Sequence, residues 1–587
     1  MVRWQTVLQP GYRLGGAIAL GAILSACGSG GEEASGPQGG GSVSVGETTG
    51  GSAVVGSTGG SSSGSGGGGG NPTSVGGANN VAGGGTTTDC SAAEVDTAPT
   101  VLRRLSLLEY QLTVQDLLSL ADPPSHEGLP PDTERLGFRT FAEYQTMSAE
   151  NLRAYMDRAS QLAADLLSDQ QRKTQVIGCD TANEDCLADF VTRFGKLAYR
   201  RPLEENEVDE ITSAAIQWAN EGEDRFAFAL EAMLSSAHFL YRVEVGDTPE
   251  GLSTLAPHEL ASRLSFALWG RGPSEQLLDD AAAGALDDSA GMAAVAADML
   301  ADDKTQVFFE SFFRQWLGYL TLKPPSADEE AVFADMEEET DRLMDEFAWG
   351  AGDFLGALTA NHSYMSDELA QFYNLPTPNA EGRVEFEASD PRANSGVLSH
   401  AALLSAKTDG DLIAMRGNWL RRTFLCEEIH LPESLADTIG ELLVGLDRIG
   451  IVEARNTRTE CATCHQAIDP IGIGLAAFDR TGIFDPEEDI YVFGIDPALP
   501  GAPEPNTFET VGELSAQLAG MPAVPACLTE RAYLYMNGRE PESEESCSLA
   551  TVEQGFVGSN HDFRGLLQGL VESPAFRLRR SPSPSEQ

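Results

Sequence analysis

The chain has 587 residues, enough for several domains, and carries 38 lysines and arginines against 89 aspartates and glutamates, so its net charge is 38 − 89 = −51. So acidic a surface repels phosphate backbones, which excludes nucleic acid as an expected partner. The same charge is typical of a well-solvated, secreted surface.

The first 27 residues predict export and a lipid anchor. Two arginines precede residues 14–24, an apolar run that is too short for a stable membrane-spanning helix. The run ends in Leu24-Ser25-Ala26-Cys27, which resembles the bacterial lipobox, and the resemblance implies cleavage before Cys27 and acylation of its sulfur. Gly28 rather than aspartate at the next position implies an outer-membrane lipoprotein, on the periplasmic face or at the cell surface. An ordinary secretory signal with an incidental cysteine is the alternative.

The rest of the chain divides by composition into a tether and a helical body. Residues 28–89 are rich in glycine, serine and threonine, and they predict a flexible, disordered linker. From about residue 100, apolar side chains recur at helical spacing, as in Leu260, Leu264 and Leu268. Strand-like alternation is scarce, and a short strand is expected at 491–493. We therefore predict a mainly α, multidomain fold.

Breaks rich in proline and polar residues indicate the domain limits. The expected parts are a signal peptide at 1–27, the linker at 28–89, helical domains at 90–170, 171–248, 249–378 and 505–580, a small cytochrome c-like haem-motif domain at 390–496, and a disordered tail at 581–587.

The string Cys461-Ala462-Thr463-Cys464-His465 is the attachment pattern of a c-type haem. The two sulfurs would add to the haem vinyl groups as thioethers, and His465 would reach the iron as an axial ligand. The alternatives are a zinc half-site, a dithiol redox pair and a strained disulfide between the two cysteines. A zinc site is disfavoured because no second ligand pair at similar spacing exists. One covalent haem c is the expected cofactor.

A sixth iron ligand is expected if the haem only passes electrons. Met521 is the preferred candidate, because it lies in a turn-like segment followed by proline; Met536, Met415, a histidine, water or no ligand are the alternatives. Three arginines, Arg416, Arg421 and Arg422, could pair with the haem propionates, although surface solvation is the expected role of at least two. Asp469-Pro470 and Gly472 are interpreted as a structural turn after the ligand.

Six further cysteines, an even number, suit disulfides in an oxidising compartment, with 15 possible connectivities. Proximity in the sequence favours Cys179–Cys186 and Cys527–Cys547. The remaining pair would be Cys90–Cys426.

Short strings along the chain resemble, in order, the secreted planctomycete-type cytochrome c-like family, which is assembled from several domains of unknown function. The resemblance extends over residues 100–580, and the set of strings is specific where each alone would be weak. The strings are Arg103-Arg104-Leu105-Ser106 with Glu109-Tyr110; Ala198-Tyr199-Arg200-Arg201-Pro202-Leu203; Phe239-Leu240-Tyr241-Arg242; Glu259-Leu260-Ala261-Ser262-Arg263-Leu264-Ser265; Gln315-Trp316-Leu317; Cys461 to His465 with Asp469-Pro470-Ile471-Gly472 and Phe478-Asp479; Asn537-Gly538-Arg539; and Ser573-Pro574-Ala575-Phe576-Arg577.

The chain departs from the family pattern at three places. Ala476-Ala477 stand where a glutamate usually precedes the Phe-Asp pair, and Phe484-Asp485 replace a frequent Trp-Arg pair. Arg455 and Asn456 stand where relatives often carry a histidine upstream of the haem motif. If that histidine helps to hold the haem in relatives, its role is vacant here.

The haem motif favours electron transfer with an unidentified redox partner protein, in the periplasm or at the cell surface. One alternative is a haem-assisted enzyme or binding protein acting on an extracellular polysaccharide, since the body far exceeds the roughly 100 residues that a bare carrier needs. The other alternative is a non-catalytic surface scaffold with a structural haem.

Overall fold

The computed structural model describes residues 97, 99–100, 102–183, 185–220, 222–248, 251–320, 322, 330–350, 352–405, 412–429, 445–488 and 490–581. The expected signal peptide with its lipidation site Cys27, the linker, Cys90 and the tail from 582 lie outside these residues.

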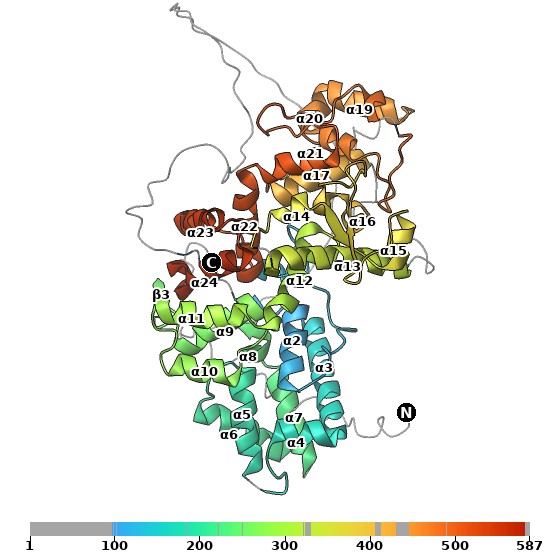
Figure 1. Ribbon diagram of the computed structural model, residues 1–587. Helices are drawn as coiled ribbons and strands as arrows, with labels where there is room; N and C mark the ends of the chain where they lie inside the picture. Colours follow the sequence, from blue (N-terminus) through green and yellow to red (C-terminus); the bar gives the residue numbers. More distant parts are fainter. Residues whose placement is uncertain are drawn as a thin grey trace, which may run out of the picture. The chain divides into compact units, whose positions relative to one another are not determined.

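The body is mainly α-helical, which confirms the predicted fold class (Figure 1). The first helices are α2 (Leu107–Leu117), α3 (Ala149–Ser168), α4 (Gln170–Ile177), α5 (Cys186–Ala198), α6 (Glu205–Trp218), α7 (Glu223–Leu234) and α8 (Ala237–Leu240), with the short 3₁₀-helix η2 (Ala142–Tyr144). The next are α9 (Pro257–Trp269), α10 (Glu275–Ala282), α11 (Ser289–Leu300), α12 (Asp303–Leu317), α13 (Glu330–Asp345), the π-helical turn η4 (Glu346–Gly350), α14 (Gly356–Thr359) and α15 (Asp367–Phe372).

The last part of the chain contains the haem motif and is also helical. Its elements are η5 (Gly396–Ser399), α16 (Ala401–Ser405), α17 (Leu412–Phe424), α19 (Arg448–Thr457), α20 (Thr459–Gly474), η6 (Ile490–Phe493), α21 (Val511–Ala519), α22 (Ala523–Asn537), η7 (Ser543–Glu545), α23 (Ser546–Gly558), α24 (Phe563–Glu572) and η8 (Pro574–Arg577). The segment 491–493, expected as a strand, is therefore a 3₁₀-helix, because Phe493 turns into a small apolar cluster with Val452 and Ile473 instead of pairing with a second strand.

Strands in the described residues are only two or three residues long, and they form antiparallel pairs between segments far apart in the sequence. The pairs are β1 (Arg103–Arg104) with β2 (Tyr241–Arg242), β3 (Leu252–Thr254) with β6 (Leu578–Arg580), and β4 (His362–Tyr364) with β5 (Arg383–Glu385). The β3–β6 pair joins the start of the central region to the end of the body.

Local sequence signals explain where the helices begin. At α2, the Ser106 hydroxyl accepts a hydrogen bond from the backbone N–H of Glu109, and the Glu109 carboxylate accepts one from the backbone N–H of Ser106 at 2.8 Å. This capping box satisfies two N–H groups that would otherwise lack partners.

Two large hydrophobic cores lie in the described part of the chain. One gathers residues from 105 to 240 with Phe266, and the other extends from 255 to 576 and also takes in Leu112, Phe138 and Phe141. Helix α2 contributes to both, with Tyr110 in the first core and Leu112 in the second. Among the described residues, no helix combines the length and the apolar character that a membrane crossing requires.

Two disulfides are present among the described residues, and only one was predicted. Cys179–Cys186 is confirmed. The predicted pairs Cys527–Cys547 and Cys90–Cys426 are wrong, because Cys426 is bonded to Cys527 across 101 residues of sequence, with 5.3 Å between their Cα atoms. Packing of the end of α17 against α22 brings these two cysteines together, so spatial distance, not sequence distance, decides the pairing. Cys547 is also disulfide-bonded.

Candidate functional site

The haem motif lies in the first half of α20, a helix that packs against both α17 and α19. Helices α19 and α20 lie beside each other in Figure 1. Two glycines allow the backbones of α17 and α20 to approach closely. A Cβ atom at Gly417 would lie 2.0 Å from the carbonyl oxygen of Ile468, and one at Gly472 would lie 1.8 Å from that of Ile413. Because neither position has room for a side chain, the two helices are locked in register.

The motif's reactive atoms share one face of α20. Cys461 is buried and Cys464 is half-buried, and neither forms a disulfide. His465 follows Cys461 by four residues, one helical turn further on, and its side chain is 20% exposed. Two free thiols therefore stand beside a partly exposed imidazole, and the predicted alternative of a disulfide between Cys461 and Cys464 is not what the structure contains.

A buried carboxylate holds the imidazole. The Nδ1 atom of His465 lies 3.0 Å from Oδ1 of Asp469, whose side chain is fully buried. A carboxylate only accepts hydrogen bonds, so Nδ1 carries the proton and Nε2 is the ring nitrogen left for a metal. This is the arrangement by which metal-binding histidines are usually oriented.

Asp469 is itself held by the helix before it. Its second oxygen accepts hydrogen bonds from Asn456 Nδ2 at 2.7 Å and Arg455 Nε at 3.2 Å. These are the two residues that stand where relatives often carry a histidine. In this chain they fix the carboxylate that fixes His465.

The role of Asp469 is not apparent from the sequence, which predicts a turn at Asp469-Pro470. The structure instead places it inside α20, four residues after His465. That spacing was the available signal, because residues four apart on a helix are neighbours.

These residues fit a covalently attached haem. The site offers two free thiols for two vinyl groups, an imidazole whose tautomer leaves Nε2 as the ligand, and an acceptor that fixes the ring. No group of three or more His, Cys, Asp or Glu side chains suited to a metal ion occurs in the described ranges.

Met521 lies in the turn between α21 and α22, where it is buried in the larger core. His465 and the motif cysteines lie on α20, and Cys461 belongs to none of the hydrophobic clusters of the described residues. Met521 as the sixth ligand stays a prediction.

The arginines of α17 have a structural role that differs from the expected one. Arg416 is almost fully buried and donates hydrogen bonds to the carbonyl oxygens of Leu475 and Phe478, both at 2.7 Å. Arg421 is also buried, donates to Pro500 O at 2.9 Å and pairs with Glu427. Both arginines are therefore buried and satisfy backbone carbonyls after α20 and in the loop at 500. Arg421 also donates to the carbonyl oxygen of Ala467 at 3.4 Å, two residues after His465 on α20.

A second cluster brings a serine, a histidine and a glutamate together without forming a nucleophile triad. Ser363 Oγ donates to Glu339 at 2.7 Å and lies 3.2 Å from Nε2 of His400. A triad requires the carboxylate on the other ring nitrogen, but Nδ1 of His400 faces the Thr340 hydroxyl at 3.1 Å. All four side chains are buried, so the cluster is a structural network.

The fold and this site define a multidomain helical protein that carries two free cysteines and a carboxylate-bonded histidine on one helix. Five family models, each described as a protein of unknown function, match consecutive segments: DUF1587 at 103–168, DUF1595 at 186–244, DUF1592 at 255–375, DUF1588 at 394–488 and DUF1585 at 505–576. The chain is thus built of planctomycete-type domains from cytochrome-c-related families of unknown function. The DUF1588 segment contains Cys461 to His465. No curated protein and no solved structure matches the chain significantly.

Proposed function

We propose that this protein is a c-type monohaem protein that transfers electrons in the periplasm or at the cell surface. The observation that carries the proposal is a pair of free cysteines, one a helical turn before His465 and the other directly before it, beside an imidazole whose Nδ1 is bonded to buried Asp469. A bound haem would supply one-electron chemistry.

The chain's own residues have distinct roles in this proposal. Cys461 and Cys464 would each add a sulfur to one vinyl carbon of the porphyrin, with the thiol proton passing to the other carbon, so no oxidant is consumed. His465 would present Nε2 to the iron, and Asp469 would keep the proton on Nδ1. Met521 would be a second protein ligand to the iron.

Attachment is tested by producing the protein with export and cytochrome c maturation and staining a denaturing gel for haem. We expect a haem-positive band and a reduced α-band in the spectrum. The variant Cys461→Ala/Cys464→Ala should lose both, whereas the matched variant Cys179→Ser/Cys186→Ser, which also removes two cysteines, should keep them. A colourless, exported wild-type protein would refute the proposal.

Electron transfer is separated from haem-assisted catalysis by ligand binding to the reduced protein. A closed, six-coordinate haem should not bind CO rapidly, and Met521→Leu should remove the methionine–iron charge-transfer band and open the iron to CO. Rapid CO binding by the wild type would count against a simple carrier.

We also propose that Cys27 anchors the protein to the outer membrane, with residues 28–89 as the tether. The lipobox-like string supports this. Mass spectrometry of the mature N-terminus should find an acylated Cys27, and Cys27→Ser should move the protein to the soluble fraction. An unmodified Cys27 in membrane-purified protein would contradict the anchor.

A further inference from the structure

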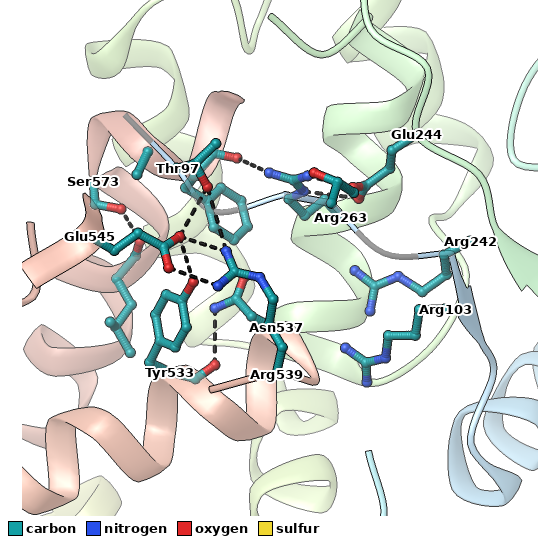
Figure 2. Close-up of a pocket in the computed structure, with 14 residues that line it drawn as sticks. Thr97, Arg103, Arg242, Glu244, Arg263, Tyr533, Asn537, Arg539, Glu545 and Ser573 are labelled. Carbon is teal, nitrogen blue, oxygen red and sulfur yellow. Dashed lines mark hydrogen bonds and ion pairs between the residues drawn. The ribbon is translucent and has the colours of Figure 1, made fainter. Parts of the chain in front are cut away.

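Far from the haem motif in the sequence, a pocket collects four arginines around a cavity of about 50 Å³ (Figure 2). Arg103 and Arg242 come from the β1–β2 pair, Arg263 from α9, and Arg539 from the segment after α22. Figure 2 shows Arg103 and Arg242 projecting side by side from one wall, with Arg539 on the opposite wall. In a chain of net charge −51, this is a local concentration of cations.

Three of the arginines are neutralised by a carboxylate of their own. Each of these ion pairs is also a hydrogen bond: Arg103 Nη2 to Glu109 at 2.7 Å, Arg263 Nε to Glu244 at 2.9 Å, and Arg539 Nη1 to Glu545 at 2.7 Å. Four guanidinium groups thus face three carboxylates, so one positive charge is left over.

Arg242 carries that charge. It is only 7% exposed, yet its side chain donates no hydrogen bond to any residue that the structure describes, and its Nη1 is buried without a partner. The nearest carboxylate oxygen, on Glu109, is 3.6 Å away and already bonded to Arg103. The ring of Phe266, 4.9 Å from the guanidinium, is its other neighbour. Burial, followed by the charge of Arg103, lowers the pKa of Arg242 to about 9, although Glu109 and Glu244 oppose the shift.

The backbone forces this arrangement. Arg103 and Arg242 are directly opposite in the β1–β2 pair, so their side chains emerge on the same face. Like charges at such positions repel, and an uncompensated buried cation is costly. The Nε atom of Arg103 is also buried without a partner, and the side chains of both arginines line the cavity. An anion in the cavity would compensate the surplus charge.

We propose that this pocket binds a small oxyanion, either a carboxylate or an inorganic phosphate or sulfate, with Arg242 as its principal ligand. A cavity of about 50 Å³ exceeds the roughly 10–15 Å³ that one water needs, and so has room for a compact group of this kind. Guanidinium donors match the planar edge of such a group in a forked arrangement. The site is independent of the haem motif and of the proposed electron transfer.

The proposal is tested by isothermal titration of the full-length wild-type protein with acetate, phosphate and sulfate, each against a sodium chloride titration of equal ionic strength. We expect saturable binding of at least one of the three, and which one binds identifies the source of the oxyanion. Binding to Arg242→Gln should be at least about tenfold weaker, because a charged hydrogen-bonding partner is lost.

Arg271→Gln is the matched control, because Arg271 is equally buried but pairs with Asp116 outside the pocket, and it should bind like the wild type. If Arg242→Gln does not fold, Arg242→Lys, which keeps the charge but not the fork, should still bind more weakly than the wild type. In anion-free buffer, Arg242→Gln should unfold at a temperature no lower than the wild type, since it removes an uncompensated charge. Absence of saturable binding to the wild type, or equal binding by the Arg242 variant, overturns the proposal.

Discussion

Single buried carboxylates decide much of this protein's chemistry, and Asp469 is the clearest case. It accepts from Asn456, Arg455 and the His465 ring, so it is satisfied on both oxygens although no water reaches it. A buried carboxylate so well bonded orients its histidine and donates electron density to it.

If the proposed haem is attached, we predict that Asp469→Asn raises its midpoint potential by about 60 mV, a tenfold change in a one-electron equilibrium, because a neutral acceptor would make His465 a weaker donor to the iron. Potentiometric titration of the purified protein measures this. The control is Asp447→Asn, since Asp447 caps α19 through Gly450 and asparagine caps equally well. Equal potentials in the Asp469 variant and the wild type would contradict the role given to Asp469.

Glu339 is the second case, and it links stability to pH. Its side chain is buried against Ser363, and desolvation raises its pKa from 4.5 to about 7. A carboxyl whose folded pKa lies above its unfolded pKa stabilises the fold below the unfolded value, and this contribution is lost as pH rises from 4.5 to about 7.

Glu339→Gln removes this loss while keeping the oxygen that accepts from Ser363. We therefore predict that the variant gains stability relative to the wild type as pH rises, by about 3 kcal/mol between pH 4.5 and pH 8. Chemical unfolding of both proteins at the two pH values gives the difference in the free energy of unfolding. Glu338→Gln, at an exposed neighbouring position on α13, should show no such trend. A pH-independent difference for Glu339→Gln would show that this carboxyl is not perturbed.

At the scale of elements, the contact between α17 and α20 sets the position of the haem motif. Gly417 and Gly472 allow the two backbones to approach closely. Arg416 of α17 donates hydrogen bonds to two backbone carbonyl oxygens of the segment just after α20 and so holds that segment in place. The helix before it, α19, supplies the groups that hold Asp469. The motif itself lies on α20, and its position depends on two further helices, α17 and α19.

We predict that Gly472→Ala destabilises the protein by about 1–3 kcal/mol, because the new methyl group meets the backbone of α17. The matched control is Gly555→Ala in α23, where the added Cβ meets nothing within 4 Å and alanine should stabilise the helix by about 0.5–1 kcal/mol. Thermal unfolding of both variants measures the effect. A stable Gly472→Ala protein would show that α17 and α20 are not tightly packed.

At the scale of the whole molecule, the Cys426–Cys527 bond ties the end of α17 to α22 and encloses the haem motif in a loop of 101 residues. The Cys179–Cys186 bond encloses only 7. Loop-closure entropy grows with loop length, so the longer bond restricts the unfolded chain more.

We predict that Cys426→Ala/Cys527→Ala lowers the free energy of unfolding by about 4–5 kcal/mol, against about 2 kcal/mol for Cys179→Ala/Cys186→Ala, from the entropy of the two loops. Denaturant unfolding of both variants under oxidising conditions tests the ranking. The reverse order would mean that native-state contacts outweigh the restriction of the unfolded chain.

Features that depend on near neighbours in the chain were accessible from the sequence. The helical spacing of Leu260, Leu264 and Leu268 predicted α9, and the short loop favoured Cys179–Cys186. The strand predicted at 491–493 was wrong, because three β-prone residues do not form a strand without a partner strand. Tertiary packing instead placed Phe493 in a small apolar cluster.

The sequence by itself determined the helical class, and it predicts Cys461, Cys464 and His465 as the reactive groups, because spacing along one helix and thiol chemistry are local properties. Only the tertiary structure decided that Cys426 is bonded to Cys527, that buried Arg416 donates to backbone carbonyls, and that Arg103 and Arg242 are opposite each other in a strand pair. The two cysteines, and likewise the two arginines of the strand pair, are a hundred or more residues apart in the sequence, and Arg416 is about sixty residues from its carbonyl partners. These contacts depend on how the apolar faces of the helices pack together, and no local sequence pattern encodes that packing.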